Sequence, residues 1–471
     1  MADKFYITTP IYYVNDVPHI GHTCTTVAAD IIARYHKLLG EKVFFLTGTD
    51  EHGAKVAQEA EAAGMEPQLF CDKVSRSFSE TWPKLNIGND YFIRTTNPDH
   101  KKIVQEIVNK INENGDVYKG KYEGWYCLGC EKFITESEME NKKCPFHPNK
   151  ELKWQVEDNY FFKLTKYVPT LIEAIENPNH LNHYEIFPES KKKEVLARLK
   201  AGINDISISR SQVTWGIPLP WDTSHTIYVW IEALFNYYSA LKINDKLEFW
   251  PADIHLLAKD ILWFHTVIWQ ALLLSVGFKL PGKIFIHSFY TIDGQKMSKS
   301  LGNAISPQDL IDKYGVDGAR YLISSTFPAF EDSDIGWNRL TEKYNADLAN
   351  GLGNLVARIA KLAEKANFKP DNGEKMVFSR EAKKKIEEFR FNEALLNIWT
   401  AVDGENKRIS DNKPWELDEK KLNKFLEPSV EKIRQIACDL QPFMPETAKK
   451  ITSQFKGPGI RFESPLFPRI K

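Results

Sequence analysis

The 471-residue chain has few cysteines and little net charge. Of its six cysteines, Cys127, Cys130 and Cys144 lie close together in the sequence, near His147, and the other three are scattered. This usage suggests a metal site and not a disulfide framework. A formal net charge of −1 with 27% charged residues describes an ordinary soluble protein.

Long apolar runs, internal repeats and low-complexity segments are also missing. No uninterrupted apolar stretch approaches the roughly 18 residues of a membrane span, so we expect no membrane partner. The first five residues lead directly into a strand pattern, without the basic and apolar leader of a signal peptide or presequence. We therefore expect a cytoplasmic protein. Its length suggests two to four domains.

The most informative stretch lies near the start of the chain. Residues 5–9 predict a buried strand, residues 10–18 a turn, and Gly21 begins a helix with an apolar face. The start of a helix suits phosphate, because its N–H groups are unpaired and it carries a partial positive charge. His19 and His22, one helical turn apart, would project together beside that anion site. In isolation, such a pair would more often only cap and pack the helix.

A second stretch, residues 293–300, changes that balance. Asp293 and Gly294 predict a tight turn, which presents Lys296 and Lys299 on a loop. Alone, this would be a solvated loop. Together the two stretches resemble the HIGH and KMSKS signatures of class I aminoacyl-tRNA synthetases.

Further candidates follow the predicted strands. The strand at residues 42–46 ends near Asp50 and His52, where parallel sheets bind ligands, although either residue could merely cap the next helix. Two helical patterns each present one aromatic face, and such stripes are more often core than pocket. These faces comprise Trp230, Ala233 and Tyr237, and then Ile261, His265 and Trp269.

The cysteine cluster has the spacing of two metal-binding knuckles. Cys127 and Cys130 form one pair, and Cys144 and His147 form the other, each separated by two residues. Three thiolates and an imidazole make a tetrahedral set suited to one structural zinc ion, with no ligand left for a substrate.

These elements predict an α/β fold, in which a Rossmann-type parallel sheet is interrupted by a zinc-binding insertion and followed by an all-α helical bundle. The expected domains are the first half of the Rossmann catalytic domain (1–114), the insertion (115–220), the second half of the catalytic domain (221–290), the KMSKS loop with a linker region (291–340), and a helical anticodon-binding domain (341–471).

The resemblance extends over essentially the whole chain and narrows to methionyl-tRNA synthetases. The stretches that carry it are residues 8–15, 19–22, 48–53, 229–233, 259–262, 296–300 and 413–415. It implies a ligase that activates methionine with Mg·ATP to methionyl-adenylate and pyrophosphate, and then transfers methionine to the 3′ adenosine of its tRNA, initiator or elongator.

The resemblance also implies roles for individual residues. His19, Gly21, His22 and Lys299 would bind ATP, with both histidines and Lys299 acting in catalysis and Lys296 in a lesser role. The methionine pocket would comprise Ile11, Tyr13, Asp50, Trp230, Ala233, Tyr237, Ile261 and His265. The anticodon contacts would be Asn354, Arg358 and Trp415.

Two departures from the family pattern are present. Ala258 stands where the family usually has Gly, which bears on ATP affinity, and Glu232 stands where Asp is frequent. The chain also ends at Lys471 without the additional C-terminal domain of some relatives, so we expect a monomer.

Other functions compete with this one. Isoleucyl, valyl and leucyl enzymes share both signatures but carry a large editing insertion, and a cysteinyl enzyme would place zinc at the substrate. A small-molecule adenylyltransferase would need neither the knuckles nor the helical tail. The intact His19, His22 and Lys299 argue against a tRNA-binding regulator without catalysis.

Overall fold

The computed structural model describes residues 3–127, 132–134, 139, 141–145, 150–297, 302–371 and 376–471. The chain divides into two compact units. The first unit comprises Met1–Val17, Lys42–Glu80 and Asn89–His287, and the second comprises Pro18–Glu41, Thr81–Gly88 and Ser288–Lys471.

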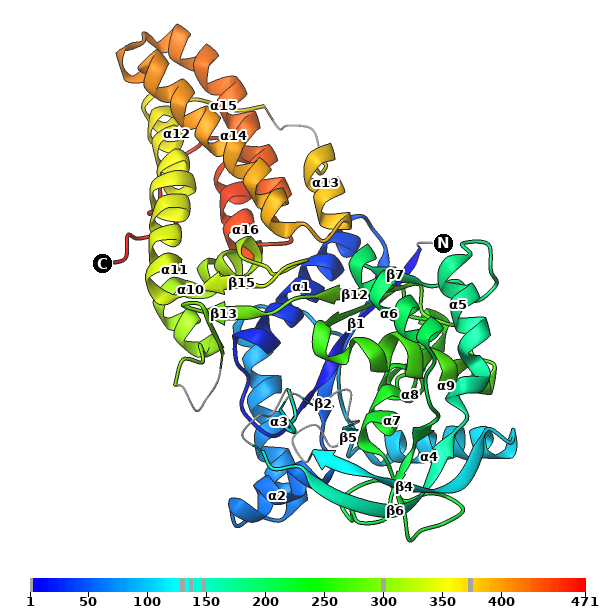
Figure 1. Cartoon of the computed structure of the whole chain (residues 1–471). Helices are drawn as coiled ribbons and strands as arrows, with labels where there is room; N and C mark the ends of the chain where they lie inside the picture. Colours follow the sequence, from blue (N-terminus) through cyan, green and yellow to red (C-terminus); the bar gives the residue numbers. More distant parts are fainter. Residues whose placement is uncertain are drawn as a thin grey trace. The chain divides into compact units, whose positions relative to one another are not determined.

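The first unit is built on a six-stranded parallel sheet (Figure 1). Its order is β3-β2-β1-β11-β12-β7, so the strand order reverses between β1 and β11, where ligands bind in open parallel sheets. The strands are β1 (Lys4–Tyr13), β2 (Lys42–Asp50), β3 (Tyr91–Arg94), β7 (Glu185–Phe187), β11 (Ile254–Ala258) and β12 (Lys283–His287).

Most helices of this unit bury apolar faces in one continuous core with the sheet. Helix α4 (Pro98–Glu113) is typical, because Ile103, Val104 and Ile107 recur at helical spacing and are buried, and the Asn97 side chain caps its first turn. The others are α2 (Ala54–Ala62), α5 (Val168–Glu176), α6 (Glu189–Ala201), α7 (Val229–Leu234), α8 (Asn236–Ile243) and α9 (Trp269–Val276).

An antiparallel ribbon within the first unit corresponds to the segment expected to hold the metal. Strands β4 (Val117–Cys127) and β6 (Lys153–Phe162) pair over ten residue positions and are flanked by β5 (Lys132–Ile134) and β8 (Ile206–Ser207). Figure 1 shows β4 and β6 as a long curved pair. A two-stranded sheet of β9 (Ser209–Arg210) and β10 (Thr226–Ile227) follows.

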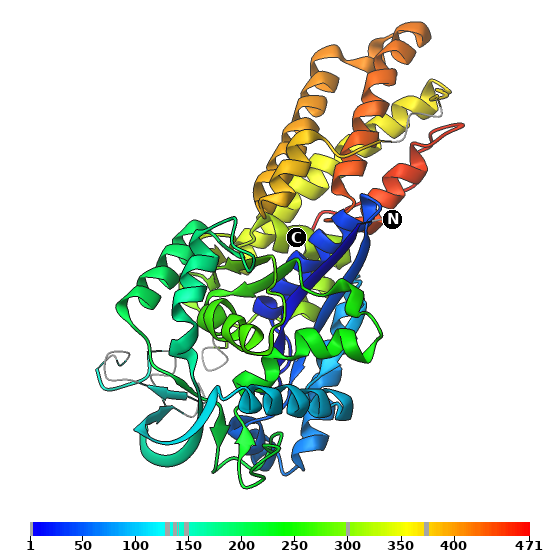
Figure 2. The same cartoon turned by 90° about the vertical axis from the view of Figure 1, so that its right-hand side faces the viewer.

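The second unit is predominantly helical. Figures 1 and 2 show α12, α14 and α15 side by side in both views. The helices are α1 (Ile20–Leu38), α10 (Pro307–Ser325), α11 (Trp337–Lys343), a π-helix (Tyr344–Gly353), α12 (Asn354–Lys365), α13 (Arg380–Glu387), α14 (Phe391–Asn412), α15 (Glu419–Leu440) and α16 (Pro445–Gln454). Helix α3 (Pro67–Lys84) begins in the first unit and ends in the second. A small sheet joins β13 (Tyr290–Ile292), β14 (Gln295–Lys296) and β15 (Ser333–Ile335).

A buried ion pair ties helix α1 into this second unit. Arg320 is fully buried on α10, and its guanidinium contacts the Asp30 carboxylate at 2.7 Å. The same guanidinium donates to the carbonyls of Leu85, Pro442 and Phe443 at 2.9–3.2 Å. A buried charge is stable only with such partners, so Arg320 fixes α1 against the end of the bundle.

The predicted α/β class, with a parallel sheet and a helical C-terminal region, is confirmed. Within the described residues, no helix combines the length and the apolar character needed to cross a membrane. Two features were not predicted. Strand β7 comes from the segment read as an insertion, and residues Pro18–Glu41 group with the C-terminal half of the chain.

Candidate active site

Two histidines cap the start of helix α1. The His19 Nδ1 atom accepts from the Gly21 N–H at 3.1 Å, and the His22 Nδ1 atom accepts from the His19 N–H at 3.3 Å. Their rings stack with centroids 3.8 Å apart. Because both Nδ1 atoms are acceptors, each neutral ring carries its proton on Nε2.

The pair therefore offers neutral donors. Desolvation and the neighbouring His19 hold the pKa of His22 well below its ordinary value. Neutral Nε2–H groups at a helix N-terminus can donate to phosphate oxygens, which fits the anion site expected from the sequence.

The described part of the lysine loop, at Met297, lies near this helix start. A Cβ added at Gly21 would lie 3.4 Å from the Met297 Cε atom and 2.9 Å from the His19 Cε1 atom. The Ile20 N–H donates to the Ile305 carbonyl at 2.9 Å, which holds the chain beyond the loop against α1. Thus Met297, the last described residue of the second signature, lies near the first signature within the second unit, although the two are some 270 residues apart in the sequence. A larger residue at position 21 would therefore require the His19 ring to shift.

Of the two signature lysines, the structure describes one. Lys296 is exposed on β14, and the Asn303 side chain donates to its carbonyl at 3.3 Å. Lys299 lies outside the described residues.

The candidates for methionine binding all lie in the first unit. Tyr13 and Asp50 are register partners at the ends of the neighbouring strands β1 and β2. Ile11 pairs with Gly48 two residues earlier. Asp50 is only 5% exposed. The carboxyl ends of adjacent parallel strands thus place an aromatic ring and a buried carboxylate together.

A hydrogen-bonded pair forms another group of these candidates. The Tyr237 hydroxyl lies 2.7 Å from the His265 Nε2 atom, and the His265 Nδ1 atom lies 3.0 Å from the Ile261 carbonyl. A carbonyl can only accept, so Nδ1 carries the proton and Tyr237 donates to Nε2. Burial lowers the pKa of His265 to about 4, although the bond to Ile261 opposes that shift, so the imidazole is neutral near pH 7.

The remaining methionine candidates lie on helix α7. Ala233 is buried, and Trp230 is half-buried with its ring stacked on Phe264 at 4.7 Å. Phe264 begins a π-helix (Phe264–Ile268) that also contains His265. The segment of Ile261, His265 and Trp269, predicted as one helical face, is therefore not a regular α-helix. Such π segments are frequent at functional sites.

A buried carboxylate–histidine cluster is also present, and its full extent was not predicted. The Glu232 carboxylate lies 2.7 Å from the His52 Nδ1 atom and 3.1 Å from the His100 Nε2 atom, with all three side chains at most 1% exposed. Burial opposes ionisation of Glu232, but the two histidines overcome it and lower its pKa. The sequence offered one signal, an acidic residue inside the otherwise apolar helix α7. Nothing in the local pattern singled out His100.

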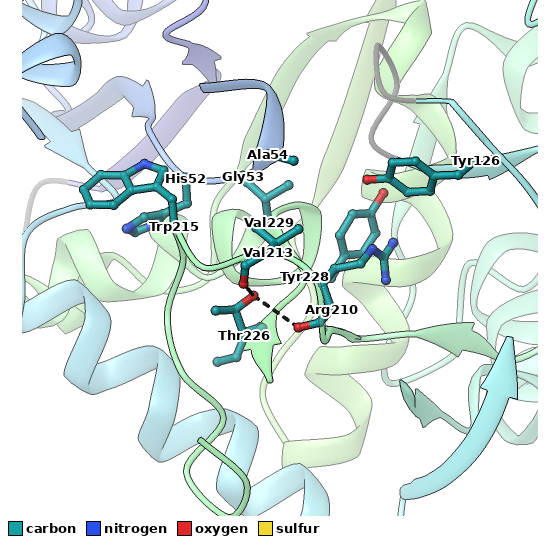
Figure 3. Close-up of a pocket in the computed structure, with 11 residues that line it drawn as sticks. His52, Gly53, Ala54, Tyr126, Arg210, Val213, Trp215, Thr226, Tyr228 and Val229 are labelled. Carbon is teal, nitrogen blue, oxygen red and sulfur yellow. Dashed lines mark hydrogen bonds between the residues drawn. The ribbon is translucent and has the colours of Figure 1, made fainter. Parts of the chain in front are cut away.

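A pocket borders His52 (Figure 3). The Arg210 guanidinium lies 3.8 Å from the ring centroid of Tyr228, and the Thr226 hydroxyl donates to the Val213 carbonyl at 2.9 Å. The lining residues are His52, Gly53, Ala54, Tyr126, Arg210, Val213, Trp215, Thr226, Ile227, Tyr228 and Val229. None of these was predicted from the sequence as a pocket residue except His52.

The expected metal ligands are described only in part. Cys127 and Cys144 are both fully buried and belong to one cluster with Ile134. Cys130 and His147 lie outside the described residues, and among the residues that are described no three or more His, Cys, Asp or Glu side chains are placed to hold a metal ion together. The two thiols that can be placed do share one buried neighbourhood, which fits a soft metal ion.

The expected anticodon residues lie in the second unit. Asn354 begins α12 and is exposed, and Arg358 follows one turn later and is half-buried. Trp415 is 47% exposed in a short 3₁₀ helix (Pro414–Glu416), and the Lys365 ammonium donates to its carbonyl at 3.3 Å. The three side chains thus lie at the start and beside the end of the same helix.

Comparison with known proteins decides the family. The chain matches the family described as tRNA synthetases class I (M) over residues 5–151 and 138–360. The chain belongs to the methionyl branch of the class I tRNA synthetases. The resemblance expected from the signature motifs is confirmed.

Individual methionyl-tRNA synthetases align over nearly the whole chain. The methionine–tRNA ligase of Thermotoga maritima is 44% identical over 95% of this chain and 74% of its own length. That of a Nostoc species is 42% identical over 98% of this chain and 91% of its own length. The structure of the Mycobacterium tuberculosis methionyl-tRNA synthetase in complex with methionyl-adenylate has a TM-score of 0.90 and 34% identity, covering 99% of this chain and 100% of that one.

Proposed function

We propose that the chain is a methionine–tRNA ligase that works in two steps. The methionine carboxylate attacks the α-phosphorus of ATP, which forms methionyl-adenylate and releases pyrophosphate. A ribose hydroxyl of the tRNA 3′ adenosine then attacks the acyl carbon and releases AMP. The observation that best supports this function is the proximity of Gly21 and Met297, one residue from each of the two signature motifs of the family, at one helix start.

In the first step the protein needs no general base, because a carboxylate is already ionised at neutral pH. Catalysis then consists of positioning and charge stabilisation. In this proposal the Nε2–H groups of His19 and His22 donate to phosphate oxygens as negative charge moves to pyrophosphate. Lys299 supplies a cation to the same phosphates, and Lys296 has a lesser role. Magnesium enters with ATP and neutralises part of the phosphate charge.

Methionine would be held by charge at one end and by shape at the other. Asp50 pairs with the ammonium group. Tyr13, Trp230 and the neutral His265 enclose the thioether, a polarisable group that favours aromatic contacts. The Tyr237 hydroxyl, by donating to His265, fixes the tautomer of this ring. Ile11, Ala233 and Ile261 complete the proposed pocket.

We also propose that the α12 region reads the anticodon. Arg358 can hydrogen-bond to a base edge and Trp415 can stack on an unpaired base, while the exposed amide of Asn354 can donate and accept. The chain would act as a 54.3 kDa monomer, and a sedimentation mass near twice that value would refute this.

A structural zinc ion is the final part of the proposal. Cys127, Cys130, Cys144 and His147 would hold it, and zinc would tie together a segment with little other core. Elemental analysis of the purified protein should find about one zinc per chain. The Cys144→Ser variant should lose that zinc, whereas a control variant of the distant Cys438→Ser should keep it. Equal zinc content in both would contradict the assignment.

The test of the function is ATP–pyrophosphate exchange with each standard amino acid in turn, without tRNA. Exchange with methionine alone would support both the pocket and the adenylate route. Exchange with a different amino acid would retain the reaction type and discard the pocket residues, and no exchange at all would discard the catalytic proposal.

A further inference from the structure

The carboxylate–histidine cluster of Glu232, His52 and His100 has no part in the steps described above. It lies entirely within the first unit and is almost completely shielded from water. Burying a carboxylate is strongly unfavourable unless partners compensate for the lost solvation. We infer that Glu232 is a positioning residue for methionine: through His52 it sets helix α7 against the ends of β1 and β2.

One end of this connection is the loop after β2. The Tyr13 hydroxyl donates to the backbone carbonyl of His52 at 3.1 Å, and His52 follows Asp50 by two residues. Two methionine candidates, the aromatic ring at the end of β1 and the carboxylate at the end of β2, are thereby tied to the backbone around His52. A shift of His52 would move both.

The other end of the connection is helix α7. Glu232 lies between Trp230 and Ala233, which are both methionine candidates, and its carboxylate receives the His52 Nδ1–H at 2.7 Å. Helix α7 has only six residues and no side-chain cap, and a helix this short has no stability of its own. Its orientation must therefore come from tertiary contacts, of which the charged bonds of Glu232 are the strongest kind.

The second histidine completes the arrangement. The His100 Nε2 atom lies 3.1 Å from the other oxygen of the Glu232 carboxylate. The His100 Nδ1 atom lies 2.7 Å from the Ser239 hydroxyl on α8. Helix α4, which carries His100, is long, capped and well packed, so it acts as the fixed support. The carboxylate thus links a rigid helix, the loop of Asp50 and the short helix of Trp230.

This inference rests on the proposed methionine pocket and assigns Glu232 no contact with substrate. If the cluster only stabilised the core, its loss would lower the stability of the protein and leave substrate binding unchanged. If it positions the pocket, its loss would impair methionine binding more than ATP binding, because ATP would be bound by residues of the second unit. Displacements of about 1 Å are enough to weaken a binding constellation strongly.

The test compares three variants by ATP–pyrophosphate exchange, with the Michaelis constants for methionine and ATP measured separately. Glu232→Ala removes both hydrogen bonds and should raise the methionine KM by about tenfold or more, with the ATP KM changed less than about twofold. Glu232→Gln keeps the shape and can keep both bonds after a change of His100 tautomer, so its methionine KM should stay within about threefold of wild type.

The matched control is Asp116→Ala. Asp116 is a buried carboxylate of the same unit, 1% exposed, and it accepts from Lys166 at 2.5 Å and Ser275 at 2.7 Å. Its loss should lower stability without changing the methionine KM. An unchanged methionine KM in Glu232→Ala, or an equal rise in both Michaelis constants, would overturn the inference.

A second pair of variants covers the case in which Glu232→Ala does not fold. In His52→Asn the side-chain amide can replace the Nδ1–H donor, whereas His52→Ala cannot. The methionine KM should rise in His52→Ala and be largely restored in His52→Asn, and equal values in both would overturn the inference. Failure of the proposed function itself would look different, because the wild-type protein would then show no methionine-dependent exchange.

Discussion

The histidines of the proposed methionine pocket and those of the proposed ATP site differ in burial and in hydrogen bonding. His265 in the first unit is 4% exposed, and its two nitrogens are bonded to Ile261 and Tyr237. His19 and His22 in the second unit are half-buried, and their Nδ1 atoms accept from backbone N–H groups. His265 is therefore held at both nitrogens, whereas the Nδ1 contacts of His19 and His22 place the ring proton on Nε2, the atom that donates to phosphate in the proposed function.

This difference follows from the two ligands. A thioether is only a weak hydrogen-bond acceptor, so the methionine side chain must be recognised by shape and by contacts with polarisable groups. Such recognition requires a pocket whose side chains are held rigidly. Phosphates are recognised by donors and charge, which a helix start and a lysine loop supply. The comparison therefore predicts that variants in one group affect one substrate far more than the other.

The largest effect is expected for Lys299→Ala. Loss of a cation that stabilises charge developing on the phosphates should lower the rate of methionyl-adenylate formation about 10²- to 10³-fold, with little change in methionine affinity. Rapid-quench measurement of adenylate formation tests this. Lys296→Ala is the matched control and should lose much less rate. Equal losses of rate and methionine affinity in Lys299→Ala would contradict the proposed separation between methionine-binding and ATP-binding residues.

A pH-dependent effect on stability is expected for His265. Its folded pKa of about 4 lies below the ordinary 6.5, so the unfolded chain binds this proton at higher pH than the folded one does. The stabilising effect is present above pH 6.5 and is lost as the pH falls toward 4, by up to about 3 kcal/mol in total.

Denaturant unfolding at pH 7 and pH 4.5 of the wild type and His265→Asn checks this. The wild type should lose more stability on acidification than the variant does. Parallel losses in the two proteins would show that His265 is not the buried neutral group described here.

A smaller effect is expected at the proposed anticodon site. Trp415→Ala removes a stacking surface worth about 1–3 kcal/mol per base, so the KM for tRNA should rise about tenfold while pyrophosphate exchange stays unchanged. Trp154→Ala, which removes another half-exposed tryptophan at 54% exposure, is the control and should leave the KM for tRNA as it was. A similar rise in both variants would argue against a specific site at Trp415.

The sequence predicted those features that have a local signal. The strand at residues 5–9, the helix that begins near Gly21 and the glycine turn before Lys296 each follow from short patterns of apolar, glycine and polar residues. The predicted turn at residues 10–18 is wrong for its first part, because β1 continues to Tyr13 by pairing with β2. A shared role of the two segments toward ATP was expected because the family resemblance implied it, but the proximity of Gly21 and Met297 was not predicted. No pattern in either segment alone points to the other.

The features missed depend on distant pairing. Strand β7 has three residues and gains its place only by pairing with β12, nearly one hundred residues later. The π-helix at His265 has an apolar sequence that an α-helix would suit equally well. The bond of His100 to Glu232 joins residues 132 positions apart, and tertiary contacts of this kind leave no periodic trace in the sequence.

The most direct test of the division into two groups is the equilibrium binding of methionine without ATP, measured by titration calorimetry. Asp50→Asn, which removes the charge opposite the methionine ammonium, should weaken binding at least about tenfold, and Lys299→Ala should bind within about twofold of the wild type. Equal weakening in the two variants, or weakening in Lys299→Ala alone, would contradict the account.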